Sequence, residues 1–132
     1  MVLEYEYVWA HEYDKGCGNA VKSRPCCLIW VREKEGPQKQ AFWVPISSVN
    51  DPSRPKLEIP SAERRSLGLR KQSWLLLDEM NIDWWPLQVR KIGGEGKGDF
   101  LYGSLSDHLY AQLVEGIRQH RERRRLIPRH AT

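Results

Sequence analysis

The sequence has few cysteines and no long hydrophobic run, and each shortage excludes a class of protein. There are three cysteines, Cys17, Cys26 and Cys27, and none are spaced as C-x-x-C. An odd number without this spacing argues against a disulfide framework and against a zinc site. No apolar stretch approaches the ~20 residues of a transmembrane helix. The opening MVLEYEYVW has acidic residues where a signal peptide carries positive charge, so we expect a cytoplasmic protein with no membrane partner.

The body of the chain also lacks an excess of positive charge. The formal net charge is +4, yet six arginines and only one glutamate lie from residue 118 onward, so residues 1–117 are close to neutral. A nucleic-acid function must therefore rest on particular residues and not on overall charge. We expect the arginine run at 121–125 to be the solvated, frayed end of a helix; contact with RNA phosphates or with an acidic partner is the alternative.

The first half of the 132-residue chain shows strand patterns. Tyr5, Tyr7 and Trp9 alternate with other residues, which predicts a half-buried strand, and the polar segment 11–23 predicts a surface loop. The apolar runs PCCLIWV (25–31) and AFWVPI (41–46) flank a Gly-Pro turn signal, so we expect a β-hairpin over residues 24–48. The two adjacent cysteines would then face opposite sides of a strand that is covered on both faces.

The second half predicts shorter elements. We expect a short strand at 56–59, one or two turns of helix at 61–69, a strand at 73–80, a short extended segment at 87–92 and a flexible glycine loop at 93–98. The glycine loop lacks the spacing of a phosphate-binding P-loop.

The strongest helical pattern lies near the C-terminus. Leu105, Leu109, Leu113 and Ile117 recur every four residues after a serine that can cap the helix, Ser104 or Ser106. Several short strands and one terminal helix, without βαβ alternation, predict a mainly β fold: a small antiparallel barrel with a C-terminal helix. We expect a single domain over 1–132, with the barrel at about 3–103, the helix at about 104–122 and a basic tail at about 118–132.

The hairpin brings two polar residues together. A turn centred on Glu35-Gly36 places Arg24 opposite Ser47, and a turn one residue later would leave Ser48 beside Arg24. Opposed side chains have Cβ atoms about 5 Å apart, so a guanidinium and a hydroxyl can share one phosphate. The alternative is that Arg24 caps a loop and that the serines merely end a strand.

The ordered motifs resemble those of the MazF/PemK toxin family. KSRPCCLIW resembles the family's R-P strand and VPISS resembles its strand ending in I-T or I-S; LEIP, LGL, SWLLLDE and YGSLS follow in the family's order. The resemblance covers nearly the whole chain. It implies an SH3-like barrel, a homodimer and a growth-inhibitor toxin of a type II toxin-antitoxin pair. Such toxins cleave single-stranded RNA without a metal or another cofactor and are blocked by a cognate antitoxin.

The resemblance also implies catalytic residues. Arg24 matches the arginine of the R-P motif, which stabilises charge at the scissile phosphate; Ser47 matches the Thr or Ser that hydrogen-bonds the phosphate; and Asp78 matches an acidic position. The implied reaction is attack of a ribose 2′-hydroxyl on its own 3′-phosphate, which requires a base, an acid and a cation. Arg24 can supply the cation but is a poor base.

The chain departs from the family pattern after the acidic pair, where Asn81 lies near the place of a second active-site arginine. The substrate-binding candidates are Ser48, Glu79, Asn81, His11, Lys22 and Trp84. His11 could transfer a proton as a general acid or base; the alternative is a loop residue that faces solvent. Trp84 could stack on an RNA base; the alternative is a contact in the core or in a dimer. The alternative function is a non-catalytic SH3-like module, or a toxin of the gyrase-poisoning type, that binds nucleic acid or a protein partner.

Overall fold

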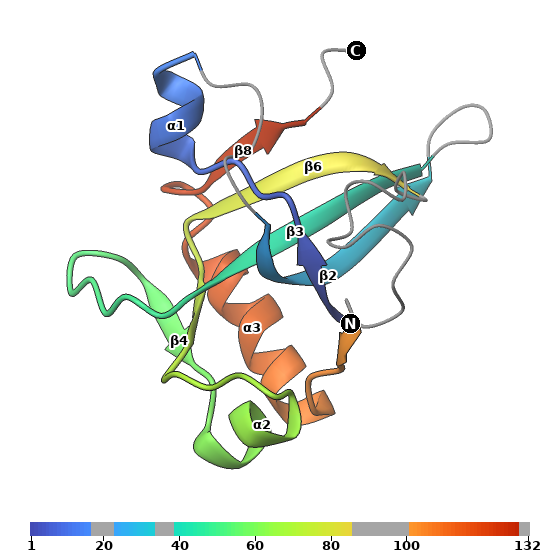
Figure 1. Cartoon of the computed structure of the whole chain (residues 1–132). Coiled ribbons are helices and arrows are strands. Elements are labelled where there is room, and N and C mark those ends of the chain that lie inside the picture. The colour runs from blue at the N-terminus through green and yellow to red at the C-terminus, as the bar shows by residue number, and fades with distance from the viewer. Residues whose placement is uncertain (17–22, 34–38, 86–100, 130–132) are drawn as a thin grey trace.

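The computed structural model describes residues 1–16, 23–33, 39–85 and 101–129, which form a mainly antiparallel sheet of eight strands with three helices (Figure 1). The strands are β1 (Val2–Tyr5), β2 (Arg24–Glu33), β3 (Lys39–Ser47), β4 (Lys56–Glu58), β5 (Trp74–Leu76), β6 (Glu79–Trp85), β7 (Leu101–Gly103) and β8 (Arg125–Pro128). The helices are α1 (Ala10–Asp14), α2 (Ser61–Ser66) and α3 (Asp107–Gln119).

The sheet has the strand order β4-β5-β3-β2-β1-β7, and β6 pairs with both β3 and β8. Over the described residues, hydrogen bonds between strands do not close it into a barrel. The mainly β class and the helix near the C-terminus are thus confirmed. Within the described part of the chain, no helix has the length and apolar character needed to cross a membrane.

The predicted β-hairpin is formed by β2 and β3. Cys26 pairs with Pro45 and Cys27 with Val44, and the register shifts by one residue between Leu28 and Trp30. The Cys26 register, extended by two residues, would set Arg24 opposite Ser47. This depends on the register shift, because on the turn side of it Glu33 pairs with Lys39. The turn at 34–38 lies outside the described residues.

The prediction of a single strand at 73–80 is wrong, because the chain bends at Leu77 and Asp78. The strand β5 before the bend pairs with the end of β3, and β6 after it pairs with the first part of β3. Both residues of the bend bond elsewhere: the Leu77 amide donates to the Pro55 carbonyl, and the Asp78 carbonyl accepts from the Arg125 amide. Competing hydrogen bonds from other segments therefore divide the strand.

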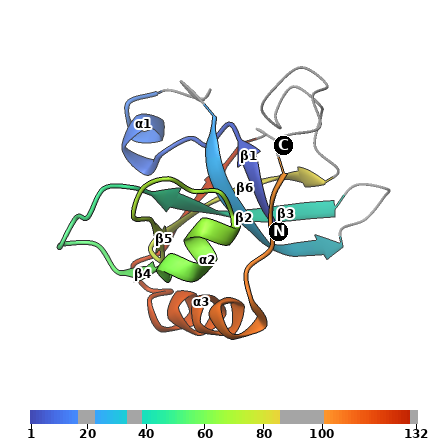
Figure 2. The same ribbon diagram turned by 60° about the horizontal axis from the view of Figure 1, so that its bottom comes forward.

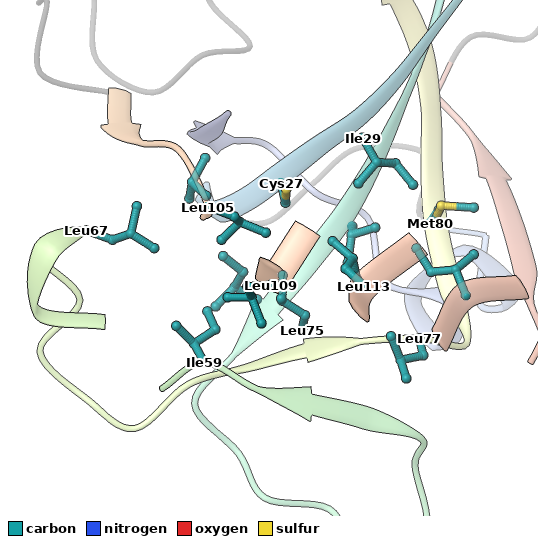
Figure 3. Packing of buried hydrophobic residues seen from close by; sticks show 14 of the residues in the cluster. Cys27, Ile29, Ile59, Leu67, Leu75, Leu77, Met80, Leu105, Leu109 and Leu113 are labelled. Atoms are coloured by element: carbon teal, nitrogen blue, oxygen red, sulfur yellow. The ribbon is translucent and has the colours of Figure 1, made fainter. Parts of the chain in front are cut away.

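Two hydrophobic clusters cover the two faces of the hairpin, and the adjacent cysteines separate between them as predicted. Cys27 belongs to the large cluster with α3, whereas Cys26 belongs to a smaller cluster with Tyr5, Tyr7 and Trp43. Figure 2 shows α3 lying beneath the sheet, and the leucines of α3 meet residues of the sheet in Figure 3.

The predicted apolar stripe of the terminal helix is confirmed. Leu109, Leu113 and Ile117 of α3 are buried, and the Ser106 hydroxyl caps the helix by accepting a hydrogen bond from the Leu109 amide at 3.1 Å. The helix runs from Asp107 to Gln119, three residues shorter at each end than the expected 104–122.

Two expectations about irregular segments are wrong. The polar stretch after Trp9 begins with the short helix α1, and the basic tail contains the strand β8, which pairs in parallel with β6. Ile127 of β8 is buried. Burial of this apolar side chain stabilises the packing of the tail on the sheet. The expected elements at 87–92 and 93–98 lie outside the described residues.

We expect Leu113→Ala to lower the free energy of unfolding by about 2–5 kcal/mol, because it leaves a cavity beneath the sheet. Urea unfolding followed by far-UV circular dichroism measures the change. Leu126→Ala is the control, since Leu126 is 44% exposed, and its effect should stay within about 0.5 kcal/mol. Equal losses in the two variants would contradict the packing of α3 on the sheet.

Candidate functional site

A pocket of about 270 Å³ lies where β2 begins and β3 ends. It is lined by Trp9, His11, Arg24, Ser47, Val49, Asp51, Arg54 and Leu76. In both ribbon views, α1 and the loop that follows β3 lie at this end of the sheet (Figures 1 and 2). Arg24, Ser47 and His11, three of the candidates from the sequence, therefore meet in one pocket.

Arg24 is the least compensated charge of the pocket. Its guanidinium lies over the Trp9 ring, with 4.6 Å between the Arg24 Cζ and the ring centroid. Its Nε is buried without a hydrogen-bond partner, and no carboxylate of the described residues forms an ion pair with it. An unpaired buried donor on a cation is costly, so the site favours an anion that accepts from it.

Two of the neighbouring groups, Ser47 and His11, suit a phosphate, whereas the third, Asp51, carries a negative charge. The Ser47 Oγ accepts a hydrogen bond from the Val49 amide at 3.0 Å, and its own proton is given to no described acceptor. The His11 ring lies nearly parallel to the Trp9 ring, with centroids 6.5 Å apart, and His11 is exposed. Hydrogen bonds from Ser53, first from its hydroxyl and then from its amide, lower the pKa of Asp51 and keep it anionic.

Arg54 is a second cation of the pocket, which the sequence analysis missed. Its Nη2 donates to Asp78 Oδ1 at 2.5 Å and to Glu79 Oε1 at 2.8 Å, and its Nε donates to Asp78 Oδ2 at 3.3 Å. Burial acts to lower the Arg54 pKa, but these bonds outweigh it and raise the pKa. No described residue accepts from Nη1. The only sequence signal was an arginine in a proline-rich loop, which does not indicate a site.

The strand β6 has a row of buried polar side chains on one face. Glu79 accepts from the Tyr7 hydroxyl at 3.0 Å and from the Ala10 amide at 2.9 Å. Asn81 bonds to both the amide and the carbonyl of Val8, at 2.9 and 2.8 Å. Asp83 accepts from the Tyr5 hydroxyl at 2.7 Å. These residues attach the N-terminal segment to the sheet.

Asn81 and Glu79 are committed to bonds within the fold. Asn81 is 0% exposed and both amide atoms are bonded to the backbone, and Glu79 is 3% exposed and accepts from three groups. Neither lines the pocket. Both bonds of Asn81 go to the backbone of Val8, so within the described residues this side chain serves the packing of the N-terminal segment.

The remaining candidates from the sequence do not line this pocket or lie outside the described residues. Asp78 does not line it and instead holds Arg54. Ser48 lines a neighbouring hollow of about 250 Å³, which also includes Arg24. Trp84 is half-buried on β6 opposite Gln40 and does not line the pocket. Lys22 lies outside the described residues.

The comparisons with known proteins name no family. No protein-family model, no curated protein and no solved structure matches this chain. Among the described residues, no group of three or more His, Cys, Asp or Glu side chains could hold a metal ion. The chemistry of the pocket must therefore be argued from its own residues.

We expect Tyr7→Phe to lower the free energy of unfolding by about 1–3 kcal/mol at neutral pH, because Glu79 loses a buried donor. Burial, followed by the charge of Glu79, raises the Tyr7 pKa in the folded protein. The stability that this provides is complete below the ordinary tyrosine pKa of about 10 and is lost as the pH rises above it. The variant should therefore lose less stability than the wild type above that pH.

Urea unfolding at pH 7 to 11 measures both effects. Tyr13→Phe is the control, because Tyr13 is 41% exposed and donates to no carboxylate of the described chain. A Tyr7→Phe profile parallel to that of the wild type would refute the buried Tyr7 and Glu79 pair.

Proposed function

We propose that this protein is an endoribonuclease that cleaves single-stranded RNA at the Arg24 pocket without a metal. The observation that carries the proposal is the uncompensated Arg24 guanidinium, whose buried Nε lacks a partner beside the Ser47 hydroxyl and the His11 imidazole. A cation, a neutral donor and a proton carrier around one small pocket are the groups that phosphodiester cleavage requires.

The proposed reaction uses the ribose of the substrate as the nucleophile. The 2′-oxygen attacks the adjacent phosphorus, the bond from phosphorus to the 5′-oxygen breaks, and the products carry a 2′,3′-cyclic phosphate and a 5′-hydroxyl. His11 takes the proton from the 2′-hydroxyl and returns it to the leaving 5′-oxygen, the role for which an imidazole is suited near neutral pH. Arg24 stabilises the charge on the phosphorane oxygens, and Ser47 donates to one of them.

Arg54 is proposed as the second donor to the phosphate. The family resemblance assigns this role to an arginine near the place of Asn81, which here is bonded to Val8. Arg54 lines the same pocket from the loop after β3, and its Nη1 is unused by the described residues. Because Asp78 and Glu79 offset its charge, it contributes a directed hydrogen bond more than a net positive charge.

We further propose that the chain is a divergent MazF/PemK toxin with an SH3-like barrel, acting as a homodimer in the cytoplasm and blocked by a cognate antitoxin. The ordered motifs support this assignment, as does the presence of Arg24 and Ser47 in the lining of one pocket. The curved sheet around one helix is compatible with an SH3-like fold in which hydrogen bonds leave the barrel open.

We expect Arg24→Ala to slow cleavage of single-stranded RNA by roughly 10²–10³-fold, the usual effect of removing one donor to a developing oxyanion. Purified protein without antitoxin is incubated with RNA, and 2′,3′-cyclic phosphate ends are counted. Arg121→Ala is the matched control, because Arg121 is exposed and does not line the pocket. Ser47→Ala should slow the reaction by a smaller factor.

Cleavage that is equal in the wild type and in Arg24→Ala would overturn the proposal, and so would RNA left intact by the wild type. In the second case, RNA binding that depends on Arg24 would favour the non-catalytic binding module.

A further inference from the structure

We propose that the Arg24 pocket also reads the base next to the phosphate and that Asp51 makes it select guanine. This inference rests on the proposed function, because it names the nucleotide that the same site accepts. It is carried by the shape of the pocket, by its apolar wall and by an anionic side chain at its edge.

The pocket has the dimensions of a site for one nucleotide. Its volume of about 270 Å³ lies just below the roughly 300–1,000 Å³ of ordinary small-molecule sites, so a large cofactor does not fit. Trp9, Val49 and Leu76 form the apolar part of its lining, whereas the charged and hydroxyl groups come from other residues. A planar base against the apolar part would leave its phosphate beside Arg24.

Trp9 is held in place by bonds within the fold. Its backbone amide donates to Glu12 Oε1 at 3.0 Å, and the next amide, of Ala10, donates to the buried Glu79. The Trp9 ring contacts Tyr7 edge to face, with centroids 5.1 Å apart, and the Arg24 Cζ lies 4.6 Å from the Trp9 centroid. Trp9 therefore fixes the guanidinium that would hold the phosphate, and the base would lie against the neighbouring Val49 and Leu76.

Asp51 supplies the selectivity. Its Oδ1 accepts from the amide and the hydroxyl of Ser53, at 2.9 and 2.7 Å, while no described residue donates to Oδ2. These bonds orient the carboxylate and keep it ionised, so that toward a ligand it acts only as an acceptor. The proximity of Lys56, whose Nζ donates to the Asp51 carbonyl at 2.7 Å, helps to fix the loop.

The four bases differ in what they offer to a carboxylate. Guanine presents two adjacent donors on its Watson–Crick edge, N1–H and N2–H₂, and both can bond to Asp51. Adenine and cytosine present one amino group beside an acceptor nitrogen, and the single N–H of uracil lies between two carbonyl oxygens that repel an anion. An acceptor-only side chain therefore ranks guanine first and uracil last.

A second hollow explains how a longer RNA can continue past this pocket. It has a volume of about 250 Å³ and shares Arg24 with the first pocket, and three serines, Ser23, Ser48 and Ser73, are part of its lining. A strand whose phosphate lies on Arg24 can place one base on each side. Serine hydroxyls both donate and accept, so we expect this second position to discriminate weakly.

Equilibrium binding of guanosine 3′-monophosphate, uridine 3′-monophosphate and inorganic phosphate tests the inference by isothermal titration calorimetry. We expect the guanine nucleotide to bind roughly 10-fold or more tightly than the uracil nucleotide, the discrimination of one bidentate pair. Asp51→Asn should remove this preference without weakening phosphate binding, because it removes a negative charge from the pocket, whereas Asp107→Asn, at an exposed aspartate on α3, should retain the preference.

The result separates the inference from the proposed function. Equal affinity for both nucleotides, or a preference that survives Asp51→Asn, overturns the inference even when RNA is cleaved at Arg24. A guanine preference that depends on Asp51 in a protein that leaves RNA intact supports the nucleotide site and overturns the nuclease. Phosphate that binds as tightly as either nucleotide shows that no base is read and also overturns the inference.

Discussion

The buried row of Glu79, Asn81 and Asp83 on β6 is the constraint on which the site depends. A carboxylate or an amide can stay in the interior only when its polar atoms are paired, and removal of one partner of a buried charge commonly costs about 3–5 kcal/mol. The N-terminal segment supplies donors from Tyr5, Tyr7, Val8 and Ala10. Trp9 lies within this segment and His11 follows it directly, so the same hydrogen bonds bring both to the pocket.

The two arginines of the pocket differ because of this row. Arg54 is held by Asp78 and Glu79, which makes it a fixed donor with little net charge. Arg24 has no such partner among the described residues and lies over Trp9 instead. One compensated and one uncompensated guanidinium offer hydrogen-bond donors to an anion without gathering enough positive charge to destabilise the fold.

Local patterns in the sequence predicted a good part of this arrangement. The apolar run of β2 and the opposite directions of Cys26 and Cys27 follow from the two-residue period of a strand, and the stripe of α3 follows from the helical period. The hairpin could be aligned because its turn residues are close in sequence, which placed Arg24 beside Ser47. Arg54, the bend at Leu77 and the strand β8 were missed, because each depends on partners far away in the chain.

The sequence by itself determined the hairpin, the terminal helix and the meeting of Arg24 and Ser47 at one end of the hairpin, because these depend on periodicity and on short chain separations. Only the tertiary structure decided which polar residues are free to act. Asn81 and Arg54 have residue types that would suit either a site or a core, and nothing near them in the sequence distinguishes the two. The Asn81 amide is hydrogen-bonded to Val8, and Arg54 is bonded to Asp78 with one nitrogen left at the pocket. In both cases the partner lies more than 20 residues away in the chain.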